Sequence, residues 1–212
     1  MTMPGISPGA ELTSILAVVC FSAGLNVYAT VGMMGVLART GALTLPDSLH
    51  GVENWYVIGA CAALFLLEFF GDKIPVFDLL WNAAHTFVRI PVAAYLAYAA
   101  TSSLPAWEQS LATLAGAMLA LAAHGGKTAA RAMVAPSPEP ISNATLSLGE
   151  DVFVVFLIWL LTKHPYVAGG IALGCAAITV VAAKFVARAL RNLLGGAERV
   201  VAGQTSEDTR RA

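Results

Sequence analysis

The sequence predicts an all-α membrane protein, a polytopic helical bundle of about six spans, and three observations lead to this fold class. Hydrophobic residues make up 58% of the 212 residues and charged residues only 12%, about half of the charged share of soluble domains. Several apolar stretches approach or exceed the roughly 20 residues that cross a bilayer as a helix. No segment shows the alternation typical of a strand. The composition therefore excludes a soluble enzyme, and the near balance of 12 basic and 13 acidic residues provides no basic face for a nucleic acid.

Six apolar stretches are the expected spans, and small residues are frequent in them. They cover residues 12–38, 55–70, 86–101, 107–124, 152–163 and 166–190. Alanine and glycine let neighbouring helices approach closely inside a membrane, where no hydrophobic effect drives them together. The expected organisation is an N-terminal tail (1–11), one transmembrane domain (12–194) and a disordered cytoplasmic tail (195–212).

The orientation follows from the basic residues. Six of them lie after Val181, which should keep the C-terminus cytoplasmic. With six spans the N-terminus is cytoplasmic as well. If residues 74–88 also enter the membrane, as a crossing or re-entrant helix, there are seven elements and the N-terminus lies on the other side.

Two similar segments raise the alternative of an internal duplication. GDKIPVFDLLW, from Gly71 to Trp81, aligns without a gap with GEDVFVVFLIW, from Gly149 to Trp159. The repeat halves would be residues 12–103 and 107–190. Halves with an odd number of crossings would form an inverted repeat, which is common in secondary transporters. The alternative is that two apolar helix entries look alike by chance.

Ionisable residues inside spans are expensive and are therefore candidates for function. In the segment around residues 68–89, Asp78, Asn82, His85 and Arg89 are four, three and four residues apart, so they form one stripe on a helix. An acid and a base on one stripe can pair, and a histidine between them can change its charge near neutral pH. Further acids, Glu68 and Asp72, lie just before this stripe.

A second, cationic stripe contains His124, Lys127 and Arg131. Two acids, Glu150 and Asp151, open the next span, where the helix dipole favours them as a cap. In the first span, Asn26 and Tyr28 interrupt the apolar run, and Asn26 needs a partner across the bundle. The alternative for all these charges is a girdle at the membrane surface, where long cationic side chains reach the headgroups.

Three segments carry a resemblance to a known family. GLNVYATVGMMGVLARTG, LEFFGDKIPVFDLLWNAAHTFVRIP and HGGKTAARAMVAPSPEPISNATLSLGED resemble an uncharacterised bacterial family of small multi-pass inner-membrane proteins, a domain of unknown function. The resemblance covers nearly the whole chain apart from its ends. It implies a bacterial inner-membrane location and brings no assigned activity.

The preferred functional hypothesis is a small proton-linked transporter or channel for an anionic solute or lipid headgroup. Asp78 and His85 would exchange protons, and Lys127 and Arg131 would hold the anionic group. The competing hypotheses are a membrane-embedded metal-dependent enzyme acting on a lipid or isoprenoid phosphate, and a non-catalytic assembly factor. No metal-binding spacing and no nucleophile beside a base occurs, so the sequence assigns no catalytic residue, metal or cofactor. The expected partners are the bilayer and a small solute or lipid, and a homo-oligomer stays open.

Overall fold

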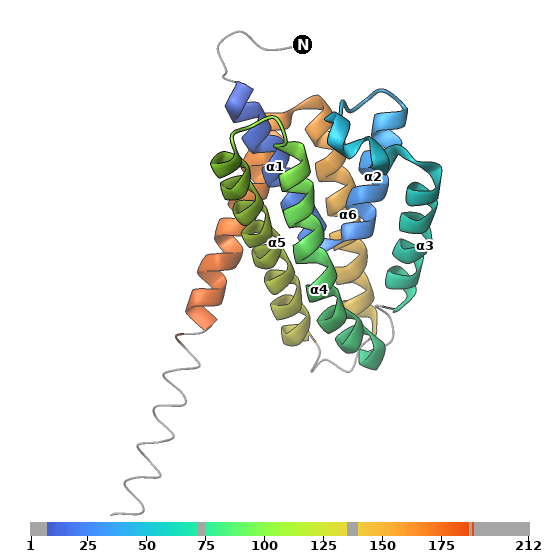
Figure 1. Cartoon of the computed structure of the whole chain (residues 1–212). Coiled ribbons are helices and arrows are strands. Elements are labelled where there is room, and N and C mark those ends of the chain that lie inside the picture. The colour runs from blue at the N-terminus through green and yellow to red at the C-terminus, as the bar shows by residue number, and fades with distance from the viewer. Residues whose placement is uncertain (1–7, 72–74, 135–139, 187, 189–212) are drawn as a thin grey trace, which may run out of the picture.

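The structure, a computed structural model, is helical throughout the part of the chain that it describes, with no strand there (Figure 1). It describes residues 8–71, 75–134, 140–186 and 188, and for residues 75–80, 131–134 and 140–144 only the backbone. The elements are α1 (Pro8–Leu25), α2 (Val27–Arg39), the 3-10 helix η1 (Asp47–Glu53), α3 (Trp55–Gly71), α4 (Pro75–Ala100), α5 (Ala106–Val134), α6 (Pro140–Lys163) and an unlabelled helix over Pro165–Val186. The all-α class is confirmed. α1 begins within the expected tail 1–11, and the expected tail 195–212 lies outside the described residues.

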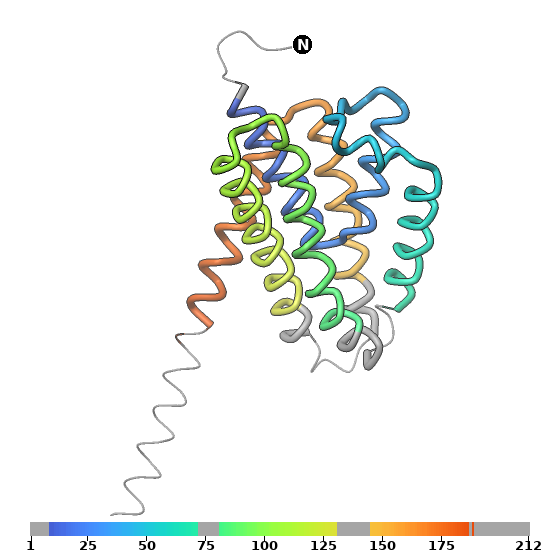
Figure 2. Tube along the Cα trace, in the orientation of Figure 1, coloured from blue at the N-terminus to red at the C-terminus, as the bar shows by residue number. Residues whose placement is uncertain are grey.

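The first expected span, residues 12–38, is not one helix but a hairpin of two. Figure 2 shows α1 running from one end of the bundle to its middle and α2 returning to the end at which α1 began. The break is at Asn26, whose backbone is extended (φ −148°, ψ 103°). Its Oδ1 accepts a hydrogen bond from the backbone N–H of Ala29 at 2.9 Å and so caps α2. Asn26 thus caps the start of α2 at the point where α1 ends. The apolar pattern of residues 12–38 did not reveal this break.

An apolar cavity of about 320 Å³ lies between the two arms of this hairpin and the elements around them. Leu12 and Leu16 of α1 and Met34 of α2 line it, together with residues 43–46 and parts of η1, α4 and α6. The first half of α1 and the second half of α2 therefore lie at the same level of the bundle, which is what a hairpin requires.

From α3 onward the helices run alternately from one end of the bundle to the other (Figure 1). α4 is continuous from Pro75 to Ala100, so the additional element expected at 74–88 and the span expected at 86–101 are two parts of one helix. Proline is tolerated in the first turn, where its missing N–H would have no partner within the helix. The expectation of a separate seventh element is therefore wrong.

The orientation of α4 and α6 also corrects the inverted repeat. Apart from Gly71, the last residue of α3, the described residues of the two similar segments lie in these helices, at 75–81 and 149–159. α4 and α6 run in the same direction (Figure 1). Copies of an inverted repeat would run in opposite directions, so the inverted arrangement does not hold for this pair.

Small residues bring α1 into close contact with its neighbours, as the sequence predicts. A Cβ atom added at Gly24 would lie 2.4 Å from the carbonyl oxygen of Ala120 on α5. One added at Gly116 would lie 2.9 Å from Cys20 Sγ and 2.8 Å from the Cβ of Ala97. Buried alanines and valines of α1, α4 and α5 complete this contact. α1 is therefore a central helix of the bundle, and the break at its end lies inside.

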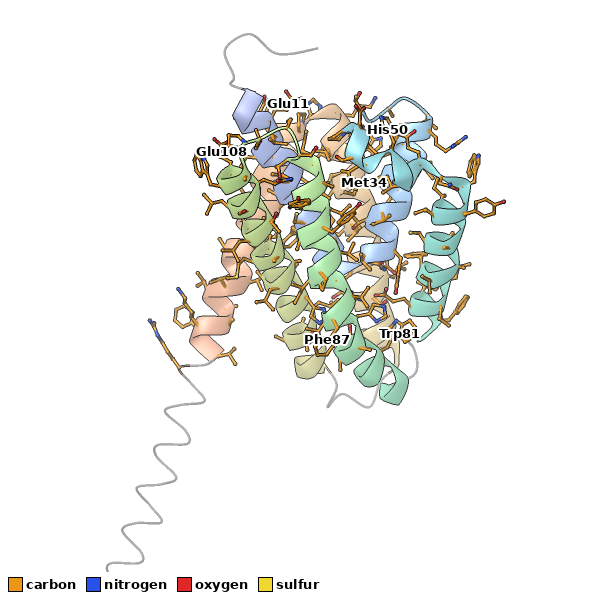
Figure 3. All side chains as sticks on the ribbon, viewed as in Figure 1. Glu11, Met34, His50, Trp81, Phe87 and Glu108 are labelled. Atoms are coloured by element: carbon orange, nitrogen blue, oxygen red, sulfur yellow. The ribbon has the colours of Figure 1, made fainter. Side chains whose placement is uncertain are left out.

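Within the described part of the chain, two helices are long and apolar enough to cross a membrane, Thr145–Lys163 within α6 and Pro165–Val186. The bent pair of η1 and α3, with an angle of 61°, counts as a third if it forms one span. Large apolar side chains cover much of the outer surface (Figure 3), and Phe87 is 82% exposed. Trp55, also exposed, lies 4.5 Å beneath the guanidinium group of Arg39. An apolar exterior with an aromatic and basic rim is typical of a protein that lies in a bilayer.

His50, at the end of the bundle where α1 starts (Figure 3), gives a prediction about pH. The 3-10 turn places it between Glu53, whose Oε1 is 2.6 Å from Nδ1, and Asp47, whose Oδ1 is 3.4 Å from Nε2. The hydrogen bond to Glu53 and the two carboxylate charges raise the pKa of His50 above its ordinary value. The pairing therefore makes its full contribution to stability below the unfolded pKa of about 6.5. This contribution is lost as the pH rises through the higher folded pKa of His50.

An NMR titration of the His50 ring measures this shift. We expect a pKa above 6.5 in the native chain and a lower value in the Glu53→Gln variant. Equal titration midpoints in the two proteins would show that the contact in the structure does not persist in solution.

Candidate functional site

Polar side chains from α1 to α6 converge inside the bundle, at the level of the break between α1 and α2. Eight of them are at most 6% exposed: Asn26, Glu68, Asn82, His85, Arg89, His124, Lys127 and Asp151. Tyr28 and Glu150 are partly buried. Because burying an unpaired charge is very costly, such a concentration persists only if its members pair with each other.

Glu68, Arg89 and Lys127 form the middle of this group, which we call the ionic centre. They come from α3, α4 and α5, and their side chains are 1%, 0% and 1% exposed. Oε1 of Glu68 accepts a short hydrogen bond from Arg89 Nη2 and lies 3.4 Å from Lys127 Nζ. One carboxylate oxygen thus bridges two buried cations.

Lys127 has two further oxygen partners, and both lie on other helices. Its Nζ donates to the carbonyl oxygen of Leu25 at 3.1 Å and lies 3.2 Å from Oε2 of Glu150 on α6. Leu25 is the last residue of α1, where carbonyl groups lack partners within the helix. An ammonium group has three N–H donors, and these three oxygens can take all of them.

The start of α2 is held in a similar way. Asn26 Nδ2 donates to Oδ1 of Asp151 at 2.9 Å, so this residue caps α2 with one side-chain atom and binds α6 with the other. The partial positive charge at a helix start favours a nearby carboxylate. Both ends of the broken helix therefore face charged side chains of opposite sign, as in the broken helices that line transporter sites.

His124 lies beside the ionic centre, and its contacts define its tautomer. Arg89 Nη1 is 3.0 Å from His124 Nδ1, and arginine can only donate, so Nδ1 accepts and carries no proton. The proton is therefore on Nε2, which donates to Thr86 Oγ1 at 2.8 Å. In this arrangement His124 is neutral and orients the guanidinium group.

His85 and Tyr28 form a second pair at the edge of the group. His85 Nδ1 donates to the carbonyl oxygen of Trp81 at 2.7 Å. Its Nε2 is 3.0 Å from the hydroxyl of Tyr28, which donates to it when the ring is neutral. The ring of Trp81 also packs on His85, with 4.6 Å between centroids.

The ionic centre has hydrogen-bonding capacity left over. Glu68 Oε2 and Arg89 Nε are buried and have no hydrogen-bond partner among the described residues. A buried polar atom without a partner costs about 1–3 kcal/mol, and more when it is charged. These two atoms are therefore candidates for a further polar partner.

The structure brings several of the predicted site residues together. Asn82, His85 and Arg89 on α4 and His124 and Lys127 on α5 are all buried, and Arg89 contacts His124. The girdle interpretation is wrong for these residues, which are buried, whereas the exposed Lys163 fits it. Asp72 lies outside the described residues, and the side chains of Asp78 and Arg131 do as well.

Two predictions meet contacts that the sequence did not indicate. Lys127 is predicted to hold an anionic solute, and in the structure its Nζ is paired with Glu68 and Glu150. Glu150 and Asp151 do not open a helix: α6 begins at Pro140, so both lie in its interior and contact the other helices. The proline-rich stretch before them concealed this earlier start.

Sequence reasoning missed two participants. Thr86 lies on the same stripe as Asn82 and Arg89, so helical spacing could have identified it. Nothing in the sequence indicated that the carbonyl group of Leu25 takes part. The position of the helix break decides which backbone oxygens lack a partner within their helix and can accept from Lys127. Among the described residues, no three His, Cys, Asp or Glu side chains are placed to hold a metal ion.

Comparison with known proteins identifies one family. A family model described as "Domain of unknown function (DUF4126)" matches residues 14–185, which run from α1 into the last helix. No curated protein and no solved structure matches the chain. The match agrees with the resemblance to an uncharacterised family that the sequence carries.

Proposed function

The chain belongs to the DUF4126 family, whose description names no activity, and from its geometry we propose a multi-pass membrane protein that moves a small anion together with a proton. The observation that carries the proposal is the position of Glu68, whose carboxylate bridges two buried cations in the middle of the helical bundle. The membrane is proposed to be the bacterial inner membrane, as the sequence resemblance implies.

The proposed topology has five crossing helices and one re-entrant hairpin. α3, α4, α5, α6 and Pro165–Val186 would cross, and α1–α2 would enter and leave on one side. α4 and α5 have 26 and 29 residues, or roughly 39 and 44 Å at 1.5 Å per residue, which exceeds the hydrocarbon thickness of about 30 Å. Their mean hydropathy is reduced by the polar side chains that they bury in the bundle.

Charge supports an orientation in which the C-terminus is cytoplasmic. Lys184 and Arg188 lie at the end of the last helix, and four further basic residues follow them in the sequence. Arg39 and Lys163 belong to the opposite end, at which α1 starts (Figure 1). Cytoplasmic loops carry an excess of Lys and Arg. The N-terminus would then lie on the outer side, in contrast to the six-span arrangement.

Glu68 would act as an internal anion that competes with the transported one. Arg89 and Lys127 are a pair of cations suited to a carboxylate or phosphate group, but Glu68 occupies the position between them while it is ionised. A proton on Glu68 would remove this competition and leave two buried cations in need of an anion. Protonation of Glu68 would thus favour entry of the anion. Movement of the anion and of the proton would then be coupled.

Charged and titratable groups on every neighbouring helix bear on this protonation. Arg89 on α4 and Lys127 on α5 contact Glu68, and Glu150 on α6 contacts Lys127. His124 contacts Arg89, and Tyr28 on α2 contacts His85. His85 would exchange a proton with Tyr28, whereas the sequence hypothesis pairs it with Asp78.

Replacing Glu68 with Gln tests the proposal. The amide mimics the protonated carboxyl group, so it should abolish the dependence of anion flux on the proton gradient. Coupling free energies of 1–3 kcal/mol correspond to about 5- to 150-fold effects, and we expect about a tenfold loss of stimulation by the gradient. The measurement is uptake of methyl phosphate into proteoliposomes with and without an imposed pH gradient, with internal pH recorded by a dye.

Glu108→Gln is the matched control, because Glu108 lies in the first turn of α5, at the far end of the bundle from the ionic centre (Figure 3). It should retain wild-type stimulation. Wild-type protein that moves no anion above the level of empty liposomes, or an E68Q variant with unchanged proton stimulation, would contradict the proposed function.

A further inference from the structure

A groove of about 210 Å³ lies between α2 and α3 and is open along one side. Its α2 wall includes Tyr28 and Gly32, and its α3 wall includes Cys61, Ala62 and Phe65. The hydroxyl group of Tyr28 contributes polarity to a lining that is otherwise almost entirely apolar. Gly32 shapes the groove, because it leaves open the space beside Cys61 that a side chain would fill.

The groove leads toward the ionic centre. Cys61, Phe65 and Glu68 are four and three residues apart on α3, so they lie on one face, and Glu68 is one turn beyond the groove wall. On α2, Tyr28 is in the first turn after the break at Asn26 and binds His85. Tyr28 and Phe65 therefore mark the end of the groove that lies nearest to His85 and Glu68.

The exposed side of α3, the helix that forms one wall of the groove, is strongly apolar. Leu66, Leu67 and Phe70 are exposed there, at 52%, 48% and 60%. In the proposed topology this surface contacts lipid chains. A molecule that enters the groove from that side needs an apolar chain, and a molecule that reaches the cations needs an anionic head.

We propose that the groove binds a single-chain anionic amphiphile from the bilayer, with its chain between α2 and α3 and its phosphate or carboxylate head directed past Tyr28 toward Arg89 and Lys127. This inference rests on the proposed function and names its substrate class. Charge supports it: once Glu68 carries a proton, as the proposed function requires, Arg89 and Lys127 would lack that counter-ion, and the guanidinium Nε of Arg89 has no partner among the described residues. The substrate would therefore be distinguished from a water-soluble anion by its chain.

Photo-crosslinking with a diazirine-bearing alkyl phosphate, on the full chain in lipid nanodiscs, tests the site. Peptide mapping should place the crosslinks on residues 28–36 and 58–65. Dodecyl phosphate should compete, whereas methyl phosphate, which lacks the chain, and dodecanol, which lacks the charge, should compete at least about tenfold more weakly, a factor that corresponds to 1.4 kcal/mol. Equal competition by dodecanol, or crosslinks spread evenly over the apolar surface, would overturn the proposal.

Two neighbouring alanines provide matched variants. Ala62 lines the groove, and Ala63 is exposed on the same helix but is not part of the lining. Ala62→Leu should fill the groove and reduce the competed crosslinking about tenfold, whereas Ala63→Leu should leave it unchanged. An equal effect of the two substitutions would contradict the groove as the binding site.

The outcomes separate this inference from the function on which it rests. Proton-linked uptake of methyl phosphate without specific crosslinking would retain the transport function and overturn the amphiphile. Specific crosslinking sensitive to A62L, without any proton-linked flux, would retain the binding site and overturn transport.

Discussion

Replacing Arg89 with Met lowers the free energy of unfolding by about 3–5 kcal/mol, the range for breaking a buried ion pair by removal of one partner. Arg89 is fully buried, and its loss leaves Glu68 with Lys127 alone and His124 Nδ1 without its donor. The measurement is reversible unfolding of purified protein in mixed micelles, followed by circular dichroism. Few single substitutions elsewhere in the chain should cost as much.

The double variant Arg89→Met with Glu68→Leu distinguishes lost pairing from lost volume. Replacing both partners of a buried ion pair with apolar residues is often neutral or stabilising. We therefore expect the double variant to recover most of the stability that R89M loses. If the two effects instead add, the cost arises from packing, and the ionic centre is not the electrostatic unit described above.

Replacing Gly24 with Ala lowers the free energy of unfolding by about 2–3 kcal/mol, toward the upper end of the usual cost of overpacking a core. The added Cβ would lie 2.4 Å from the carbonyl oxygen of Ala120 and 2.8 Å from the Cβ of Ala123. Because the nearest atom belongs to the backbone of α5, no rotamer change relieves the contact, and α1 must move away. That movement also weakens the bond between Lys127 and the carbonyl of Leu25, one residue farther along α1.

Gly59→Ala is the control for this prediction. Gly59 also lies within a helix, but nothing lies within 4 Å of an added Cβ. The substitution should be neutral or stabilise the protein by up to about 1 kcal/mol, because glycine disfavours a helix interior. Thermal unfolding of both variants in the same detergent measures the difference, and a G24A protein as stable as G59A would show that α1 and α5 are not in close contact.

Much of the candidate site was predictable from helical spacing. A helix places residues three and four apart on one face, so Asn82, His85 and Arg89 had to share a stripe, as did His124 and Lys127. Their apolar surroundings indicated that the stripes face inward, because a lipid-facing charge is costly. Two facing stripes on neighbouring helices could therefore be predicted from the sequence. In the structure the Arg89–His124 contact joins them.

The pairing within the site was not predictable in the same way. Asp78 and His85 were assigned the proton chemistry because they stand on one stripe, yet the carboxylate beside Arg89 comes from Glu68 on another helix. The contact joins residues 21 positions apart, and helix spacing carries no information across a connecting loop. The break at Asn26 was visible as an irregularity, but its consequence, a return of the chain to the side from which it came, was not.

The sequence by itself determined the helical class, the apolar exterior and the side chains that share each helix face, because composition and the 3.6-residue period are local properties of the chain. Only the tertiary structure decided that α1 and α2 form a hairpin, that Glu68 lies between Arg89 and Lys127, and that a groove leads toward them. The physical reason is that a buried ion is stable only beside an opposite charge. Which helix supplies that charge depends on how closely small residues such as Gly24 and Gly116 let the helices approach.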